Sequence, residues 1–367
     1  MTRLAFDAAN SAVPQTHALL IGVGEYAHLQ DGVSPAEVTY GLGQLLSPPA
    51  SVAAFARLLL DKRNDLIPPL GSLSVLCSGG SITDNHGTID AGAPLMGEIS
   101  TAFKEWRSRS ESNAENLALF YFCGHGIDTA ALVLLPEDFL ADPANLDERA
   151  INFSHTYRAM DACIMRRQLF FIDCCRNAPR QLSDVGLLGV SLSTSTAELQ
   201  QSPYRSVYYA AREGQQAHAA PGRTVSYFTK AVIDGLEGRA AARQDSKSNR
   251  WVVRTTALTE AISAIMSEQG RRWSSPGEVS VLDIAFCDQG KAWTSVTCQP
   301  ESALRDAHFR VFCDEMLHDE DLPPRNGPWQ FMLPAGKYDF RAALPEDLEI
   351  WKRGQIVLPP THDCVLP

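Results

Sequence analysis

The sequence predicts an α/β fold: a mostly parallel sheet flanked by helices on both faces, followed by a small all-β module. Up to residue 290, short apolar runs alternate with amphipathic stretches of helical period, as in strands joined by crossover helices. After residue 290 the helical period disappears, and strand-like runs separated by turn residues replace it. We therefore expect two domains, residues 1–290 and residues 291–367.

Continuous apolar runs mark the buried strands of the first domain. They lie at residues 17–23, 73–77, 117–123, 131–135, 168–172 and 207–210. Between them, apolar residues recur at helical spacing. The helices are expected at residues 51–60, 95–106, 154–165, 225–236 and 258–265. In sheets of this kind, ligands bind at the edge formed by the carboxyl ends of the strands.

The second domain reads as short strands with turns between them. These strands are expected at residues 293–298, 308–312, 329–333, 338–342 and 350–358. Acidic residues gather at positions 314–321, either as a calcium-binding cluster or, as we favour, on the solvated face of a β-hairpin. No cofactor is indicated, and calcium dependence stays open.

Charge and composition exclude several classes of protein. The chain has 43 acidic and 32 basic residues, a net charge of −11, so general binding to nucleic acid or anionic membranes is not expected. No apolar run is long enough to span a membrane, and the first residues lack a signal-peptide core. Nine scattered cysteines without close His/Cys spacing indicate reduced thiols in a cytoplasmic protein without a zinc or other metal site.

Two turns carry residues suited to nucleophilic catalysis. His125 lies between Gly124 and Gly126, directly after the strand at 117–123, and Cys175 follows the strand at 168–172. Both turns should reach the carboxyl edge of the sheet. A cysteine and a distant histidine at strand ends match the layout of a thiol nucleophile and its base.

The turns at residues 121–126 and 173–176 resemble, in type and order, those of the caspase-like (clan CD) cysteine peptidases. The resemblance covers roughly residues 15–288 and suggests a member of prokaryotic origin with a C-terminal accessory domain. The acid Asp173, two residues before Cys175, is closer to metacaspases than to animal caspases.

The resemblance implies a mechanism for these residues. Cys175 attacks a peptide carbonyl as thiolate, and His125 helps to form the thiolate or protonates the leaving amine. The backbone N–H groups of Gly126 and Cys175 stabilise the oxyanion. Cys174, the neighbour on an extended segment, points the other way, into the sheet.

Specificity follows from the same resemblance. In metacaspases the acid at the position of Asp173 lines the S1 pocket and selects arginine or lysine. A second pocket acid is missing here, because Ser51 stands in the matching stretch. Ser51 accepts a hydrogen bond but carries no charge, and Asp128 or Asp138 could replace the missing acid.

The resemblance therefore implies a cysteine endopeptidase that acts on protein substrates, cuts after arginine or lysine, and is activated by a partner or ligand in a cell-death or defence pathway. Alternatives are a catalytically silent adaptor and an enzyme with another P1 preference. A redox switch formed by Cys174 and Cys175 ranks lowest, because vicinal disulfides are strained.

Overall fold

The computed structural model describes residues 4–84, 87–193, 203–212, 214, 222, 224–273, 276–299, 301–345 and 348–367. The chain divides into two compact units. One unit comprises Met1–Ile233 and Met266–Ala285, and the other comprises Asp234–Ile265 and Phe286–Pro367. Residues 234–265 thus group with the C-terminal strands, although the apolar pattern of the sequence suggests a boundary at residue 290.

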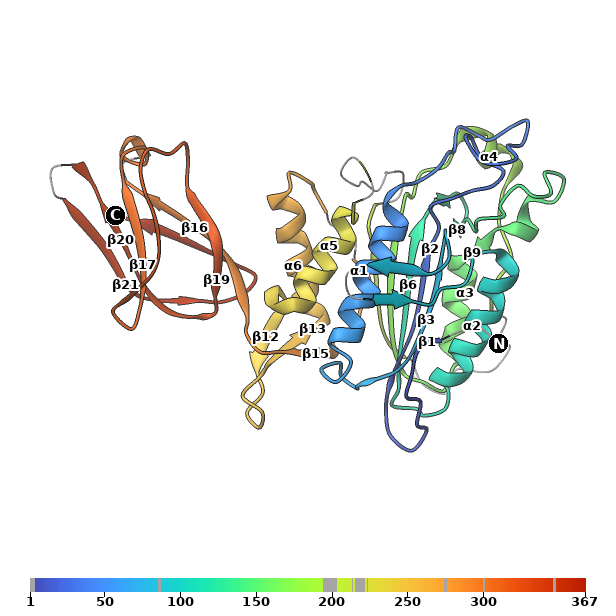
Figure 1. The fold of residues 1–367 in the computed structure, drawn as a ribbon, viewed down its shortest axis with the longest axis horizontal. Coiled ribbons are helices and arrows are strands. Elements are labelled where there is room, and N and C mark those ends of the chain that lie inside the picture. Colours follow the sequence, from blue (N-terminus) through green and yellow to red (C-terminus); the bar gives the residue numbers. More distant parts are fainter. Residues whose placement is uncertain are drawn as a thin grey trace. The chain divides into compact units, whose positions relative to one another are not determined.

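A seven-stranded sheet forms the centre of the first unit (Figure 1). In spatial order its strands are β1 (Leu4–Asp7), β3 (Leu70–Cys77), β2 (Thr16–Gly22), β6 (Leu117–Gly124), β10 (Arg167–Cys174), β11 (Tyr204–Tyr209) and β14 (Pro276–Val279). The five inner strands run parallel, and the two edge strands β1 and β14 run antiparallel to their neighbours. The predicted mostly parallel sheet is confirmed.

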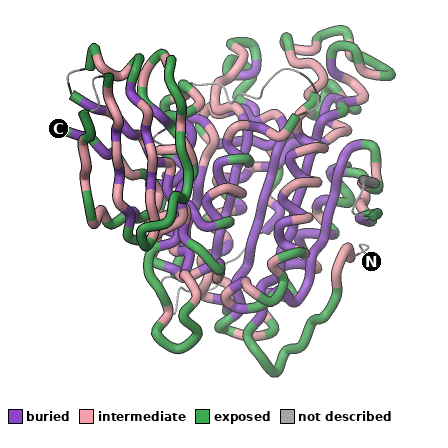
Figure 2. The backbone as a smooth tube through the Cα atoms, turned by 60° about the vertical axis from the view of Figure 1, so that its left-hand side comes forward, coloured by how far each residue is buried: buried purple, intermediate pink, exposed green. Residues whose placement is uncertain are grey.

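Helices cover both faces of this sheet, as the alternating pattern predicts. The helices of the chain are α1 (Ser47–Asp61), α2 (Met96–Ser110), α3 (Phe153–Ala159), α4 (Arg180–Val185), α5 (Tyr227–Asp234) and α6 (Thr255–Glu268). On one face, Phe55 of α1 packs edge-on against Tyr121 and Phe171. On the other face, Phe103 and Trp106 of α2 contact Phe120. Consecutive residues of β6 therefore pack against helices on opposite faces of the sheet. All eight residues of this strand are buried (Figure 2).

Smaller elements complete the first unit. They are the hairpin of β4 (Ile82–Asp84) and β5 (Gly87–Ile89), the small sheet of β7 (Gly126–Asp128), β8 (Leu132–Leu134) and β9 (Ile151–Asn152), and 3₁₀ turns at Leu146–Arg149 and Met160–Ala162. The short sheet lies directly after β6, because β7 begins two residues beyond the end of that strand.

The second unit contains the predicted all-β module. Two strands of the second unit come before the module, namely β12 (Ala241–Gln244) and β13 (Trp251–Arg254), and β15 (Asp283–Cys287) also precedes it. The strands of the module are β16 (Lys291–Cys298), β17 (His308–Cys313), β18 (Met316–Asp321), β19 (Trp329–Pro334), β20 (Gly336–Ala343), β21 (Glu349–Val357) and β22 (Thr361–Leu366). A three-stranded sheet, β19-β16-β22, and a four-stranded sheet, β18-β17-β20-β21, share one apolar core. The acidic residues 314–321 lie in the β17–β18 hairpin, as favoured from the sequence.

Within the part of the chain that the structure describes, no helix is both long and apolar enough to cross a membrane. The same residues hold no group of three or more His, Cys, Asp or Glu side chains arranged to bind a metal ion.

Candidate active site

The turns that carry His125 and Cys175 are neighbours at the carboxyl edge of the sheet. In the parallel pair β6–β10, Gly124 lies opposite Cys174 in register. His125 and Cys175 are each the next residue in the chain, so the sheet itself brings the two turns together. Gly22 at the end of β2 lies opposite Cys123, which places the third strand end at the same edge. The chain leaves β2 toward β3 on one side and reaches β6 on the other, so this edge is the topological switch point where such folds bind ligands.

Gly126 fixes how closely the two turns approach. A Cβ atom at this position would lie 2.3 Å from Cys174 Sγ and 2.6 Å from Cys175 O. Any other residue would push the turn after His125 away from the turn that bears Cys175. The role of the Gly126 and Cys175 N–H groups in an oxyanion hole stays a prediction, but their backbones are in contact.

The His125 ring is held by the loop that follows β2. Its Nε2 lies 2.7 Å from Gly43 O, and its backbone N–H donates to the Tyr26 hydroxyl at 2.8 Å. A carbonyl only accepts hydrogen bonds, so Nε2 carries a hydrogen and, in the neutral ring, Nδ1 is the free base. The Tyr26 ring packs against the imidazole at 4.9 Å. Burial lowers the pKa of His125, although the hydrogen bond to Gly43 acts in the opposite direction.

The two adjacent cysteines have different surroundings. Cys174 is 1% exposed and belongs to the apolar core on the α2 face of the sheet. Burial is the first cause that raises the pKa of Cys174 well above its usual range, followed by the negative charges of neighbouring groups. Cys175 is partly exposed at the end of β10. The prediction that Cys174 points into the sheet agrees with its burial.

An ion pair joins the two turns beyond the His and Cys positions. Arg176 Nε and Nη2 lie 2.8 and 2.7 Å from Asp128 Oδ2, and both side chains are 12% exposed. The Arg176 guanidinium also stacks on the Tyr209 ring at 4.4 Å. Asp128, one of the acids suggested for the S1 pocket, is thus paired with Arg176 of the Cys175 turn.

The structure brings Asp173 and Ser51 together on the α1 face, and their role in an S1 pocket stays a prediction. Ser226 bridges them, because its N–H donates to Ser51 Oγ at 2.9 Å and its hydroxyl donates to Asp173 Oδ2. Thr229 Oγ1 donates to the same carboxylate oxygen at 2.7 Å. Asp173 is only 4% exposed. Burial raises its pKa, although the hydrogen bonds that it accepts act in the opposite direction.

Cys123 also belongs to this cluster, because its thiol hydrogen-bonds to Ser51 and Asp173. Sequence reasoning missed Ser226 and Thr229, which lie more than fifty residues from Asp173 and have no local signal. Cys123 could have been found, because it lies opposite Asp173 in the register of β6 and β10. Asp138, the other acid suggested for the pocket, bonds Arg149 and the N–H of Met96.

The chain is similar to one family model and to known proteins. The family model of the caspase domain matches residues 83–272, just over half of the chain. The uncharacterized protein y4kE from Sinorhizobium fredii (strain NBRC 101917 / NGR234) is 29% identical over 206 residues, which cover 54% of this chain and 58% of that protein. The chain thus spans little more than half the length of this relative. Caspase-1 from Spodoptera frugiperda matches with a TM-score of 0.41 and 12% identity, over 77% of this chain and 94% of its own. Because the matched family segment covers more than half of the chain and contains both turns, the chain belongs to the caspase domain family.

Proposed function

We propose that the protein is a cysteine endopeptidase that hydrolyses protein substrates after arginine or lysine, with Cys175 as nucleophile and His125 as acid–base. One observation carries this proposal. The His125 and Cys175 turns follow register-paired residues of neighbouring strands, and Gly126 packs without a gap against the backbone of Cys175. The register therefore supports a site in which the His125 and Cys175 turns act together at the carboxyl edge of the sheet.

The reaction begins when the His125 Nδ1 lone pair accepts the proton of Cys175, and the imidazolium that results stabilises the thiolate. The sulfur attacks the peptide carbonyl, and the oxyanion accepts hydrogen bonds from the N–H groups of Gly126 and Cys175. Protonated Nδ1 then gives its proton to the leaving amine, which breaks the C–N bond and leaves a thioester. A water molecule, deprotonated by His125, hydrolyses the thioester and restores the thiol.

Asp173 supplies the selectivity in this proposal. Its carboxyl group is buried, and an arginine or lysine side chain placed beside it would hold it ionised. A charge pair about 4 Å apart is worth up to about 4 kcal/mol at an effective dielectric of about 20, which is enough to select a cation over an anion. Asp173 is 4% exposed, and Ser226 and Thr229 both donate to its Oδ2, so a substrate cation has to open this buried cluster to reach the carboxylate.

That closed arrangement supports a further part of the proposal, namely activation by a partner protein or ligand. A substrate that must open the Asp173 cluster meets an energetic cost, which an activator could remove by shifting the first turn of α5. We place the enzyme in the cytoplasm, in a regulated proteolytic pathway such as cell death or defence, as a metacaspase-type member of the family.

The test uses fluorogenic peptides that carry Arg, Lys or Asp at P1, with and without calcium. We expect release from the Arg and Lys peptides by the wild type and by Cys174→Ala, and none by Cys175→Ala. Asp173→Asn should lower kcat/KM for Arg and Lys peptides by at least about 100-fold, because the buried countercharge is lost.

Release after aspartate would contradict the role of Asp173 and favour another P1 preference. Silence of the wild type on every peptide, in the presence of a cell extract as a source of activator, would favour a binding protein that uses the fold as an adaptor. Equal activity of wild type and Cys175→Ala would remove Cys175 as the nucleophile.

A further inference from the structure

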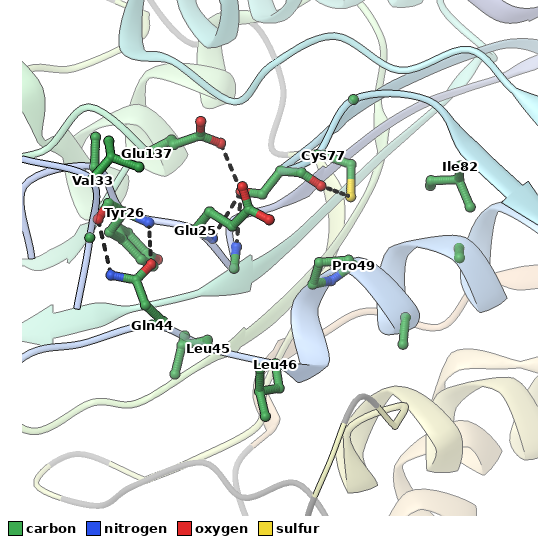
Figure 3. A pocket seen from close by; sticks show the side chains of 18 of the residues that line it. Glu25, Tyr26, Val33, Gln44, Leu45, Leu46, Pro49, Cys77, Ile82 and Glu137 are labelled. Atoms are coloured by element: carbon green, nitrogen blue, oxygen red, sulfur yellow. Dashed lines mark hydrogen bonds between the residues drawn. The ribbon is translucent and has the colours of Figure 1, made fainter. Parts of the chain in front are cut away.

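A pocket of about 820 Å³ lies beside the candidate active site, at the carboxyl ends of β2 and β3 (Figure 3). Its lining comes from residues 24–27 and 44–46 after β2, the start of α1, and residues 77–82 at and beyond the end of β3. Tyr26 belongs both to this lining and to the partners of His125. The pocket is therefore continuous with the loop that positions the acid–base histidine.

Hydrogen bonds hold the floor of this pocket in place. Gln44 pairs with the backbone of Tyr26 through both of its amide atoms, at 2.7 and 3.0 Å. The Ser78 hydroxyl accepts hydrogen bonds from the N–H groups of Gly24 and Glu25, each at 3.1 Å. The same hydroxyl donates to Glu137 Oε2 at 2.8 Å. Such a framework forms the pocket before a ligand arrives.

The charge of the pocket selects the sign of its ligand. The lining residues that are charged at neutral pH are all acids: Glu25, Asp31 and Glu137. The Ser78 hydroxyl bonds both Glu137 and the N–H of Glu25, and Figure 3 shows these two acidic side chains near one another. Burial first, and then the charges of Glu25 and Asp138, raise the pKa of Glu137. A cation placed between the carboxylates would relieve this repulsion, whereas an anion at the Gly79–Gly80 turn would meet a field of the wrong sign.

The walls of the pocket are apolar. Leu45, Leu46, Pro49, Val33 and Ile82 line it. Leu46 is 51% and Val33 is 93% exposed. A ligand with an apolar stem and a cationic head fits these surroundings better than a bare metal ion does. Lysine and arginine side chains have this composition.

The order of the strand ends shows which part of a substrate reaches the pocket. If Cys175 attacks the carbonyl and His125 protonates the leaving amine, the residues after the scissile bond extend from β10 past β6, toward β2 and β3. Neighbouring strands lie about 4.8 Å apart, so the ends of β2 and β3 are about 10 to 14 Å from that of β10. An extended peptide covers this distance in about three or four residues.

We propose that this pocket is a second specificity site, which binds a lysine or arginine side chain about three or four residues after the scissile bond. The proposal rests on the proposed peptidase function and adds a substrate class to it: chains with a basic residue at P1 and another basic residue on the leaving side.

The kinetic test compares peptides with a constant P1 residue and Lys, Ala or Glu at the third and fourth positions after it. The wild type should prefer Lys over Glu by about tenfold in kcat/KM, as expected for partly exposed charge pairs. Glu25→Lys, an exposed side chain whose change leaves the Ser78 hydrogen bond to its N–H intact, should reverse this preference. Glu137→Gln should weaken it.

Controls separate the pocket from the rest of the site. Glu37→Lys, an exposed change in the same loop outside the pocket lining, should keep the wild-type preference. A fluorogenic substrate without residues after P1 should be cleaved equally by the wild type and by Glu37→Lys. Equal cleavage of the Lys, Ala and Glu peptides by the wild type, or an unchanged preference in Glu25→Lys, would overturn the proposal.

A binding arm distinguishes failure of this proposal from failure of the proposed function. Fluorescein-labelled Ala-Ala-Lys-Lys and Ala-Ala-Glu-Glu peptides are titrated into Cys175→Ala protein, and anisotropy is measured. Tighter binding of the lysine peptide, lost in the double variant with Glu25→Lys, supports the pocket even when no peptide is cleaved. Equal binding of both peptides rejects the pocket whether or not the enzyme is active.

Discussion

Cys174 and Cys175 are adjacent in the chain, but strand alternation gives their thiols different environments. Cys174 is enclosed by the core, and burial raises its pKa well above the usual range. Cys175 lies one residue beyond β10 and is partly exposed. Access and thiolate formation together control alkylation, so the two residues should react at different rates.

We therefore predict that iodoacetamide at pH 7.5 modifies Cys175 at least about tenfold faster than Cys174 in the native protein. Peptide mapping by mass spectrometry measures both rates. In 8 M urea, where burial is lost, the difference should shrink to a few-fold. Equal native rates would show that the thiol of Cys174 is accessible.

His17 is a buried histidine on β2, remote from the catalytic edge. It is 1% exposed, and its Nδ1 lies 2.8 Å from Ser72 Oγ. Burial and the charge of Arg109 lower the pKa of His17 to about 4, although Asp7 acts in the opposite direction. Below pH 6.5 the unfolded chain binds a proton at this site that the folded chain does not bind. The folded state therefore loses stability as the pH falls from 6.5 toward 4.

This difference predicts that His17 contributes a loss of about 2 kcal/mol in the free energy of unfolding between pH 7 and pH 5. Urea unfolding at both pH values, on wild type and His17→Asn, isolates the contribution because all other groups are shared. The variant should lose less stability than the wild type. Parallel losses in the two proteins would contradict the lowered pKa.

At the scale of elements, the site depends on how two strand-to-loop turns fit together. The pairing of β6 with β10 brings the two turns into register, and Gly126 permits their contact. The ion pair between Arg176 and Asp128 then links the residues that follow each turn. The pair is mostly shielded from water, so removal of one partner would leave a buried charge.

We predict that Gly126→Ala lowers kcat/KM by about 100-fold and the free energy of unfolding by about 1 to 3 kcal/mol. The new Cβ would collide with Cys174 Sγ and with the Cys175 carbonyl oxygen. Gly97→Ala is the matched control, because a Cβ at this exposed position of α2 meets no atom within 4 Å. That variant should keep full activity. An active, stable Gly126→Ala protein would mean that the two turns are not packed together.

At the scale of the whole molecule, the second unit is built from two separated parts of the chain. Arg239, only 3% exposed, donates from Nη2 to Pro360 O at 3.1 Å. Gly238 approaches Gln289 so closely that a Cβ would lie 2.4 Å from its carbonyl oxygen. Residues 234–265 therefore depend on the C-terminal strands for part of their burial.

Truncation after Gly290, the domain boundary that the sequence suggests, should lower the apparent Tm by at least about 5 °C or make the protein insoluble. The reason is that Arg239 and its neighbours would lose partners within their own unit. Differential scanning fluorimetry of residues 1–290 and of the full chain measures the effect. An unchanged Tm would show that residues 1–290 form an independent domain.

The sequence alone predicts the parallel sheet, the helices on both faces and the β module. It also predicts that His125 and Cys175 lie at strand ends. These features follow from apolar periodicity and glycine-containing turns, which are local properties of the chain. It also placed Asp173 and Ser51 in one site, through a family resemblance. The sequence analysis did not predict the short edge strands β1 and β14, because their burial depends on neighbouring strands and leaves no clear apolar pattern.

Other features of the site and of the domains are visible only in the tertiary structure, because they depend on contacts between residues far apart in the chain. The hydrogen bond from His125 to Gly43 uses a backbone carbonyl, which has no signature in the sequence. Thr229 of α5 and Ser226, the residue before that helix, bond Asp173 from more than fifty residues away, and Asp128 pairs with Arg176. The acidic pocket combines loops after two strands, and residues 234–265 join the C-terminal unit. Each of these depends on long-range packing, which a single sequence does not encode as a local pattern.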